Sequence, residues 1–414
     1  MSVPVVTGLG TAAPTGLDVK SFWAAALRGE LAIAPIRRFD AGGYDTTLAG
    51  ELRGFSPMET IPGRLVPQTD IWTQIGLYAI DCALADSGLE LAGPGLDGSS
   101  SRGYDLSVIT AASAGGVEFG QREIENLWAK GPKYVGAYQS IAWFYAATTG
   151  QASIRHGFRG QCDTIVTEAA GGLDSFDAAA RALSEGARAV VCGGCDSPLS
   201  PYGLVCQMAS GSLSRGKDPE RAYAPFQRHA DGYVPGEGGA MFLLEDLSSA
   251  IARNAPRRYG WFAGHAATFS ADVPALISAI EQALASARVE PAQVDVVFAD
   301  ALGVPERDEH EAAALSAVFG PHGVPVTAPK TGFGRLACGG SALDVAAGLL
   351  SIRDQVIPPT VGVVAVRPEL ELDLVADRPR PATVRTVLVV ARGAGGFNSA
   401  LVLRTVDAAS NHSQ

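Results

Sequence analysis

The chain has 414 residues, of which 47% are hydrophobic and 18% charged, and 49 are glycine. This balance is typical of a densely packed α/β protein and excludes a disordered or fibrous chain. The formal net charge of −11 at pH 7 argues against a nucleic-acid-binding protein. The sequence has neither a basic leader nor an apolar run of about 18 residues, the length that spans a membrane, so we expect a soluble, cytoplasmic protein.

Apolar, β-branched segments without alternating polarity recur along the chain, and they predict strands that are buried on both faces. These segments are residues 3–9, 105–110, 187–194, 240–245, 294–300 and 386–393. Helical periodicity lies between them, most clearly over residues 70–87 and 273–287. Alternation of this kind indicates an α/β fold with helices on both faces of the sheet.

One internal similarity suggests a duplication. The segment GGLDSFDAAARAL from Gly171 resembles GGSALDVAAGLL from Gly339, since in both a glycine pair leads into an apolar helix that carries an Asp. Both helices are apolar on most faces, as helices buried between two sheets would be. We predict two similar halves, 1–250 and 251–407, followed by a frayed polar tail at 408–414.

The six cysteines are scattered and do not form a disulfide framework. Cys192 and Cys195 have the CxxC spacing of a redox pair or half of a zinc site, but the second half of a zinc site is absent from the sequence. We therefore predict free buried thiols, and we expect neither a metal nor a cofactor.

A strand–turn–helix pattern surrounds the first glycine pair. Residues 164–167 are strand-like, and an apolar helix follows Gly171. This shape commonly exposes a reactive Ser or Cys at a helix N-terminus. Here the turn holds Ala169 and Ala170, so the pattern predicts an active-site scaffold without a nucleophile.

Several segments together resemble the β-ketoacyl synthases, and more specifically the chain-length factor, the ketosynthase-like subunit of bacterial type II polyketide synthases. They are VVTGLGTAAPTGLDVKSFW at 5–23, FGQREIENLW at 119–128, AYQSIAWFYAATTGQASIRHG at 137–157, GYVPGEGG at 232–239 and RGAGGFNSA at 392–400. The resemblance covers nearly the whole chain. It implies a thiolase fold, with duplicated βαβαβαββ halves in five layers, α-β-α-β-α.

The same resemblance locates three catalytic positions, and all of them are vacated. A condensing ketosynthase uses a Cys thiolate to carry the acyl chain and two His residues for decarboxylation and enolate stabilisation. Matching positions here hold Ala169, Asp300 and Arg335. An alanine methyl cannot attack, and a guanidinium is no base at neutral pH. We expect no condensing activity, and we predict that Asp300 and Arg335 form a buried salt bridge.

Other family positions are retained or altered. Lys330, Asp308 and Glu311 match scaffold positions of the family, and we interpret them as structural. The family commonly has Gln where this chain has Ala169, and a role of that amide in priming is therefore doubtful here. Condensing members carry a GFGG gate, whereas residues 393–396 read GAGG, so the gating ring is absent.

The resemblance also implies a steric role in setting chain length. In the family a tunnel runs along the heterodimer interface, and bulky residues of this subunit plug its far end. The matching positions are Val117, Gly120, Ile124 and Ile141. These side chains are smaller than the Phe residues found in members that stop at short chains, so we predict a tunnel for a chain longer than an octaketide. The alternative is that Trp143 or Tyr202 fills the freed space.

An aromatic segment predicts the contact with the partner. Its members are Tyr138, Trp143, Phe144 and Tyr145. Aromatic residues of this kind are enriched at binding hot spots, although core packing is an alternative. The resemblance implies two partners, an active ketosynthase α subunit and an acyl carrier protein that brings malonyl groups and the growing chain.

Two other functions remain open at this point. The chain could be a stand-alone acyltransferase or thioester hydrolase that uses Ser175 or Cys162, although we expect Ser175 to be buried. It could also be an assembly partner that has no effect on product length. We do not expect any of the six histidines to act as a base.

Overall fold

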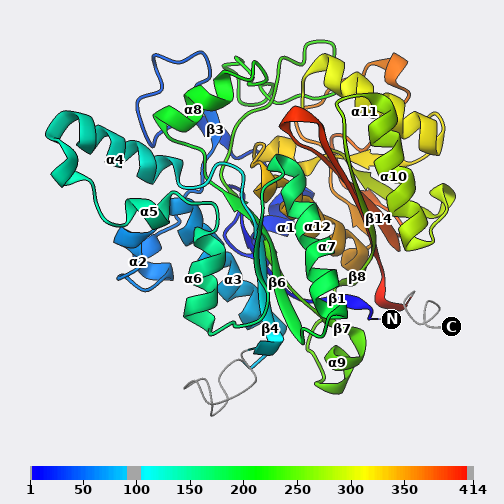
Figure 1. Ribbon diagram of the computed structural model, residues 1–414. Coiled ribbons are helices and arrows are strands. Elements are labelled where there is room, and N and C mark those ends of the chain that lie inside the picture. Colours follow the sequence, from blue (N-terminus) through cyan, green and yellow to red (C-terminus); the bar gives the residue numbers. More distant parts are fainter. Residues whose placement is uncertain (1, 91–103, 408–414) are drawn as a thin grey trace.

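The computed structural model describes residues 2–90 and 104–407. Its centre is an 11-stranded mixed sheet with the strand order β12-β10-β9-β14-β15-β8-β1-β7-β6-β4-β5 (Figure 1). The strands are β1 (Pro4–Ala12), β4 (Leu106–Ala111), β5 (Cys162–Ile165), β6 (Ala189–Asp196), β7 (Gly238–Asp246), β8 (Gly260–Phe269), β9 (Val296–Phe298), β10 (Pro325–Thr327), β12 (Asp373–Leu374), β14 (Thr386–Arg392) and β15 (Phe397–Arg404). Two small two-stranded sheets lie outside it, β2 (Ile33–Pro35) with β3 (Leu48–Gly50) and β11 (Val356–Ile357) with β13 (Arg380–Pro381).

The strand order repeats. In the first half β5, β4 and β6 are parallel neighbours, and β7 and β1 follow as antiparallel strands. In the second half β10, β9 and β14 are parallel neighbours, and β15 and β8 follow as antiparallel strands. The halves meet where β1 pairs with β8 through Val5–Trp261 and Val6–Gly260. The fold is therefore duplicated, and the change from one repeat to the next falls between β7 and β8.

The helices form three layers around the two half-sheets. The central layer is α7 (Gly171–Ser184) and α12 (Cys338–Asp354), and α12 packs on β6, β7 and β14. The outer faces are covered by α3 (Ile71–Ser87) on β1 and β7, and by α10 (Val273–Ala287) on β8 and β15 (Figure 1). The remaining helices are α1 (Val19–Arg28), α2 (Pro57–Thr60), α4 (Val117–Lys130), α5 (Gln139–Ala142), α6 (Ala147–His156), α8 (Pro201–Met208), α9 (Leu247–Ala252) and α11 (Pro305–Phe319).

The similar segments noticed in the sequence are the starts of the two central helices. A Cβ on Gly172 would lie 2.4 Å from the carbonyl oxygen of Cys338, and one on Gly339 would lie 2.1 Å from that of Gly238. Glycine is required at both positions because neighbouring backbone lies where a side chain would be. The sequence similarity therefore reflects the close approach of buried helices in each half.

Most of the predicted elements are confirmed. The predicted strands correspond to β1, β4, β6, β7, β9 and β14, although β9 is only Val296–Phe298, and the predicted helices correspond to α3 and α10. The strand before the vacated turn ends at Ile165, two residues earlier than predicted. The predicted tail at 408–414 lies outside the described residues. Within residues 2–90 and 104–407, no helix is long and apolar enough to cross a membrane.

Candidate functional site

The vacated turn is held by hydrogen bonds and presents a buried alanine. It joins β5 to α7, and Glu168 takes a left-handed backbone conformation there with φ of 53°. Ala169 is only 3% exposed, and its carbonyl accepts a hydrogen bond from the Ser341 hydroxyl at 2.5 Å. The Thr167 hydroxyl donates to Asp174 on α7 at 2.6 Å. The turn keeps the shape of a nucleophile-bearing elbow, but it presents a buried methyl group.

Asp300 and Arg335 meet, as the sequence predicts. The Arg335 guanidinium lies 2.9 Å from the Asp300 carboxylate, and it donates a second bond to the Arg392 carbonyl at 2.7 Å. Both side chains are buried. Two residues beyond Arg392, the Ala394 N–H donates to the Glu168 carboxylate at 3.0 Å. The buried Asp300–Arg335 pair is therefore linked to the turn that carries Ala169 through the segment 392–394.

The electrostatics of this pair keep it ionised. Burial alone would raise the pKa of Asp300, but the charges of Arg335 and Lys330 outweigh burial and lower that pKa. Burial alone would lower the pKa of Arg335, but Asp300 outweighs it and raises that pKa. Each group therefore holds the other in its charged form, and neither is available as a proton acceptor at neutral pH.

The retained scaffold residues have backbone partners. Lys330 forms an ion pair with Asp344 at 2.5 Å and donates to the Asp300 carbonyl at 3.2 Å. Glu311 accepts from the N–H groups of Asp300 and Ala301 at 2.7 and 2.9 Å. These contacts fix the strand end that carries Asp300.

Asp308 fixes the neighbouring loops. It accepts from the N–H groups of Gly303 and Phe226 at 2.9 and 2.8 Å. Burial raises the pKa of Asp308 to about 7. The contacts favour the structural interpretation of Asp308, Glu311 and Lys330.

Sequence reasoning missed two buried groups of this region. Asp344 forms the ion pair with Lys330. In the sequence it was noticed only as the Asp of the segment GGSALDVAAGLL, with no role assigned to it. His265 on β8 lies 3.0 Å from Asp174 and 2.9 Å from the Ser399 hydroxyl, both through Nε2. The His265 side chain is 7% exposed, and its contacts link β8 to α7 and β15.

The alternative nucleophiles are poorly placed. Ser175 is fully buried and donates to the Gly172 carbonyl at 2.9 Å. Cys162 is exposed, but partial burial of its sulfur raises the pKa of the thiol, which lowers the thiolate fraction. Cys192 and Cys195 are free and buried, as predicted. Burial raises the pKa of all three thiols, which disfavours their thiolate forms.

The predicted tunnel positions lie on α4 and α5, away from the ionic cluster. Val117, Gly120 and Ile124 follow a helical spacing that puts them on one side of α4. A Cβ on Gly120 would lie 3.8 Å from the Cβ of Trp143, an ordinary contact distance. Trp143 therefore approaches Gly120 without closing the space of a side chain there. Val117 is half-buried, and its Cγ2 faces Gly203 of α8.

Large apolar side chains around these positions are exposed in the single chain. We call them the α4–α5 face: Ile124, Tyr138, Ile141, Trp143, Phe144 and Tyr145, each between 36% and 52% exposed. In Figure 1 both helices lie at the periphery of the molecule. Such a patch on a folded protein marks an interaction surface. Core packing, the alternative for the aromatic segment, is therefore wrong for these side chains. Trp128, Tyr134 and Tyr202 extend the exposed surface and were not predicted as part of it.

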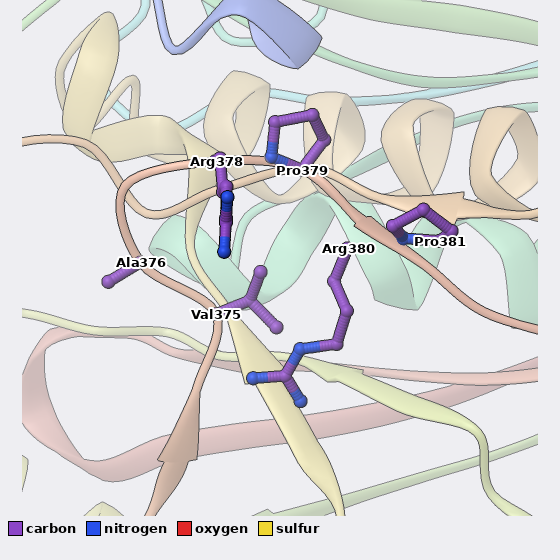
Figure 2. A pocket seen from close by; sticks show the side chains of 6 residues that line it. All are labelled: Val375, Ala376, Arg378, Pro379, Arg380 and Pro381. Atoms are coloured by element: carbon purple, nitrogen blue, oxygen red, sulfur yellow. The ribbon is translucent and has the colours of Figure 1, made fainter.

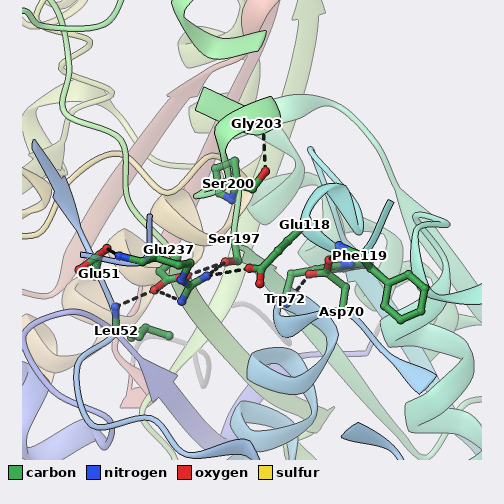
Figure 3. A network of polar contacts seen from close by, with 12 residues as sticks. Glu51, Leu52, Asp70, Trp72, Glu118, Phe119, Ser197, Ser200, Gly203 and Glu237 are labelled. Atoms are coloured by element: carbon green, nitrogen blue, oxygen red, sulfur yellow. Dashed lines mark hydrogen bonds and ion pairs between the residues drawn. The ribbon is translucent and has the colours of Figure 1, made fainter. Parts of the chain in front are cut away.

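A polar network anchors the start of α4 to the core (Figure 3). Arg38 reaches the Glu237 carboxylate at 2.7 Å, the Ser197 hydroxyl at 3.2 Å and Glu118 of α4 at 3.3 Å. The Asp70 carboxyl caps α3 and also accepts from the Phe119 N–H at 2.7 Å. The residues come from distant parts of the chain, and no sequence pattern indicated them. They fix the start of α4, the helix that carries three of the predicted tunnel positions.

Two cavities are described here, one beside this polar network and one at residues 375–381. One of about 320 Å³ includes Arg38, Asp70 and Phe119 in its lining. Another, of about 560 Å³, is lined by Val375, Ala376, Arg378, Pro379, Arg380 and Pro381 (Figure 2). That second cavity contains none of the predicted site residues, and its Arg380 is paired with Asp373 at 2.6 and 2.8 Å. We do not assign the site to it.

Comparison with known proteins agrees with this geometry. The β-ketoacyl synthase N-terminal domain matches residues 3–250, and the C-terminal domain matches residues 259–364. The tetracenomycin polyketide synthase ketoacyl synthase beta subunit of Streptomyces glaucescens is 54% identical, over 98% of this chain and 99% of its own. The actinorhodin polyketide putative beta-ketoacyl synthase 2 of Streptomyces coelicolor is 50% identical, over 98% of each chain.

Solved structures give the same answer. The ishigamide ketosynthase/chain length factor superposes with a TM-score of 0.88 at 25% identity, over 98% of this chain and 99% of that one. A type II acyl-carrier protein complex with its hexaketide-bound ketosynthase gives a TM-score of 0.87 at 25% identity, over 98% and 100%. The fold, the vacated turn and these relatives agree. The chain belongs to the β-ketoacyl synthase family, in the branch of the ketosynthase beta subunits, or chain-length factors, of type II polyketide synthases.

Proposed function

We propose that this chain is a catalytically silent partner that forms a heterodimer with an active Cys-His-His ketosynthase and sets polyketide chain length by shaping the tunnel between them. The observation that carries the proposal is the α4–α5 face, a set of large apolar side chains that are exposed in the single chain and surround the predicted tunnel positions. Burial against a partner would remove this surface from water.

The chemistry of the closed turn supports the silent role. Condensation requires a thiolate to accept the acyl chain, and Ala169 offers a methyl group. It also requires groups that donate to a developing enolate, whereas Asp300 is an anion at that position and Arg335 is engaged by it. Ala169 is buried and lacks the side-chain carboxamide of the Gln that the family commonly has at this position. We therefore do not expect a priming decarboxylation of malonyl groups at this turn.

Two features support a heterodimer. The segment of the α4–α5 face is rich in aromatic residues, which dominate binding energy at protein interfaces. In addition, β5 is the last strand at one end of the large sheet, where its backbone can pair with a strand of another chain. The similar proteins include a ketosynthase/chain length factor and a ketosynthase bound to its acyl carrier protein. By this similarity the active ketosynthase and the carrier protein are the proposed partners here.

The small residues on α4 support a long tunnel. Gly120 has no side chain, and the nearest heavy atoms around its Cβ position are 3.8 Å away. Trp143 borders this space but does not fill it. We propose that the tunnel admits a chain longer than an octaketide.

The test is product length from the reconstituted heterodimer with the carrier protein and malonyl groups. Gly120→Phe and Val117→Phe should shorten the main product by one or more two-carbon units, because a ring would occupy the tunnel's end. Ile251→Phe, on exposed α9, is the matched control and should leave the product unchanged. An intact complex with unchanged product length would mean that the chain is an assembly partner only. Thioester hydrolysis by the isolated chain would favour the stand-alone enzyme.

A further inference from the structure

The helix α4 has little tight packing of its own. Three of its residues are buried, all within its first two turns, and the half beyond residue 123 is almost wholly exposed. Cavities of about 320 and 190 Å³ lie beside its start, and both include Arg38 and Glu118 in their lining. Close packing therefore does not by itself fix where the start of α4 lies.

Two polar links join the start of α4 to the core. The Arg38 guanidinium donates to Glu118 at 3.3 Å and to the fully buried Glu237 carboxylate at 2.7 Å (Figure 3). The Phe119 N–H donates to the buried Asp70 carboxyl at 2.7 Å. A single guanidinium thus connects the first turn of α4 to the residue that precedes β7.

Arg38 is itself held in place. The Glu51 carboxylate accepts from the backbone N–H groups of Arg37 and Arg38 at 2.9 and 3.1 Å. Glu237, in turn, accepts from the Ser197 hydroxyl at 2.5 Å. Because a guanidinium is planar and its donors have fixed directions, a side chain held at its base and at one donor also defines where the other donor points.

The turn that Arg38 holds is the one that carries the predicted tunnel positions. Val117 immediately precedes Glu118, and Gly120 follows two residues later. A shift of this turn would move both positions relative to the sheet. In a tunnel that is closed by α4, such a shift changes the depth at which the acyl chain stops.

We infer that Arg38 is a positioning residue for chain length, because it holds the first turn of α4 against the core so that the chain stops at one length. Its role is to place α4, and it need not touch the acyl chain. The inference rests on the proposed function, since it requires α4 to form the end of the tunnel.

The experiment measures the distribution of product lengths from the reconstituted heterodimer, with the carrier protein and malonyl groups and with this chain at saturating concentration. Arg38→Met removes the charge, so the ratio of the main product to products one two-carbon unit longer or shorter should fall by about tenfold, the factor that one hydrogen bond to a charged group contributes. Total consumption of malonyl groups should stay close to that of the wild type, because the condensing site of the partner is unchanged.

Two variants of Glu118 test the link at its other end. Glu118→Leu removes the acceptor on α4 but leaves the pair of Arg38 with Glu237 intact, and it should lower the ratio as Arg38→Met does. Glu118→Gln keeps an acceptor of the same length and should restore most of the ratio. The Glu118 side chain is 38% exposed, so these variants should fold even if Arg38→Met does not, and they then decide the result.

Arg253→Met is the matched control. Arg253 pairs with Glu245 at 2.5 Å, and the side chains of this pair are 21% and 1% exposed, against 25% and 0% for Arg38 and Glu237. Glu245 lies at the opposite end of β7 from Glu237, and Arg253 follows α9. This variant should lose similar stability and keep the wild-type distribution of lengths.

The inference is overturned if Glu118→Leu and a folded Arg38→Met keep the wild-type distribution, or if Arg253→Met changes it as much as they do. Gly120→Phe separates this inference from the proposed function. If Gly120→Phe shortens the product and the Glu118 and Arg38 variants change nothing, only the positioning role fails. If Gly120→Phe has no effect either, the proposed function fails first.

Discussion

The vacated catalytic pocket and the α4–α5 face differ in every physical respect. The pocket is buried and ionic, and its charged groups are paired with one another or with backbone. The face is exposed and apolar, and its side chains have no covering layer within the described chain. Each is unusual by itself, because charges favour water and large apolar groups favour the interior.

The two regions therefore contribute differently to the folded chain. Asp300 and Arg335 form an ion pair with each other across the vacated positions, and the second carboxylate oxygen of Asp300 is buried without a hydrogen-bond partner among the described residues. The α4–α5 face, by contrast, leaves large apolar side chains in contact with water in the isolated chain. We propose that the Asp300–Arg335 pair now maintains the fold, whereas the α4–α5 face and the predicted tunnel positions on α4 carry the activity.

The largest effect is expected from breaking the pocket. Asp300→Ala leaves the Arg335 guanidinium buried without its counter-charge, and such losses cost about 3–5 kcal/mol of unfolding free energy. Denaturant unfolding of the purified chain measures it. The double variant Asp300→Ala/Arg335→Met removes both charges and should recover most of the loss. A single variant as stable as the wild type would show that the pair does not hold the pocket.

A smaller effect, on association rather than folding, is expected at the face. Ile124→Asp and Trp143→Asp each place a charge against the partner, and each should weaken the heterodimer by about 2 kcal/mol or more, which is roughly thirtyfold. Titration of the two purified subunits measures it, with unfolding of the single chain unchanged. Ile251→Asp, equally exposed on α9, is the control. Equal affinity for all three variants would remove the face from the interface.

The two regions also differ in how far sequence predicted them. Continuous apolar runs predicted most of the buried strands. The family motifs assigned Ala169, Asp300 and Arg335 to the vacated catalytic positions, and the ion pair between Asp300 and Arg335 was predicted from that assignment. The anchoring of α4 could not be predicted in this way. Arg38 and Glu237 are 199 positions apart, and a contact between such distant loops leaves no periodic signal in the sequence.

The smallest effect concerns pH, and it has opposite signs for Asp300 and for Asp70. The pKa of Asp300 is lowered, so its contribution to stability is present at neutral pH and is lost only in acid.

Asp70, which anchors α4, behaves oppositely. Burial outweighs its backbone hydrogen bonds and raises its pKa to about 7. Between its unfolded pKa of about 3.9 and that value, the folded state holds a proton that the unfolded state has released. Stability therefore falls as pH rises through this window, by on the order of 2 kcal/mol from pH 5 to 7. Asp70→Asn should make the fall smaller by that amount in denaturant titrations at several pH values. Asp18→Asn, at a residue whose pKa is lowered, should keep the wild-type slope over this range. If Asp70→Asn also keeps the wild-type slope of stability against pH, the Asp70 carboxyl is ionised in the folded protein at neutral pH. The start of α4 is then held by a carboxylate, as the region of Arg335 is held by Asp300.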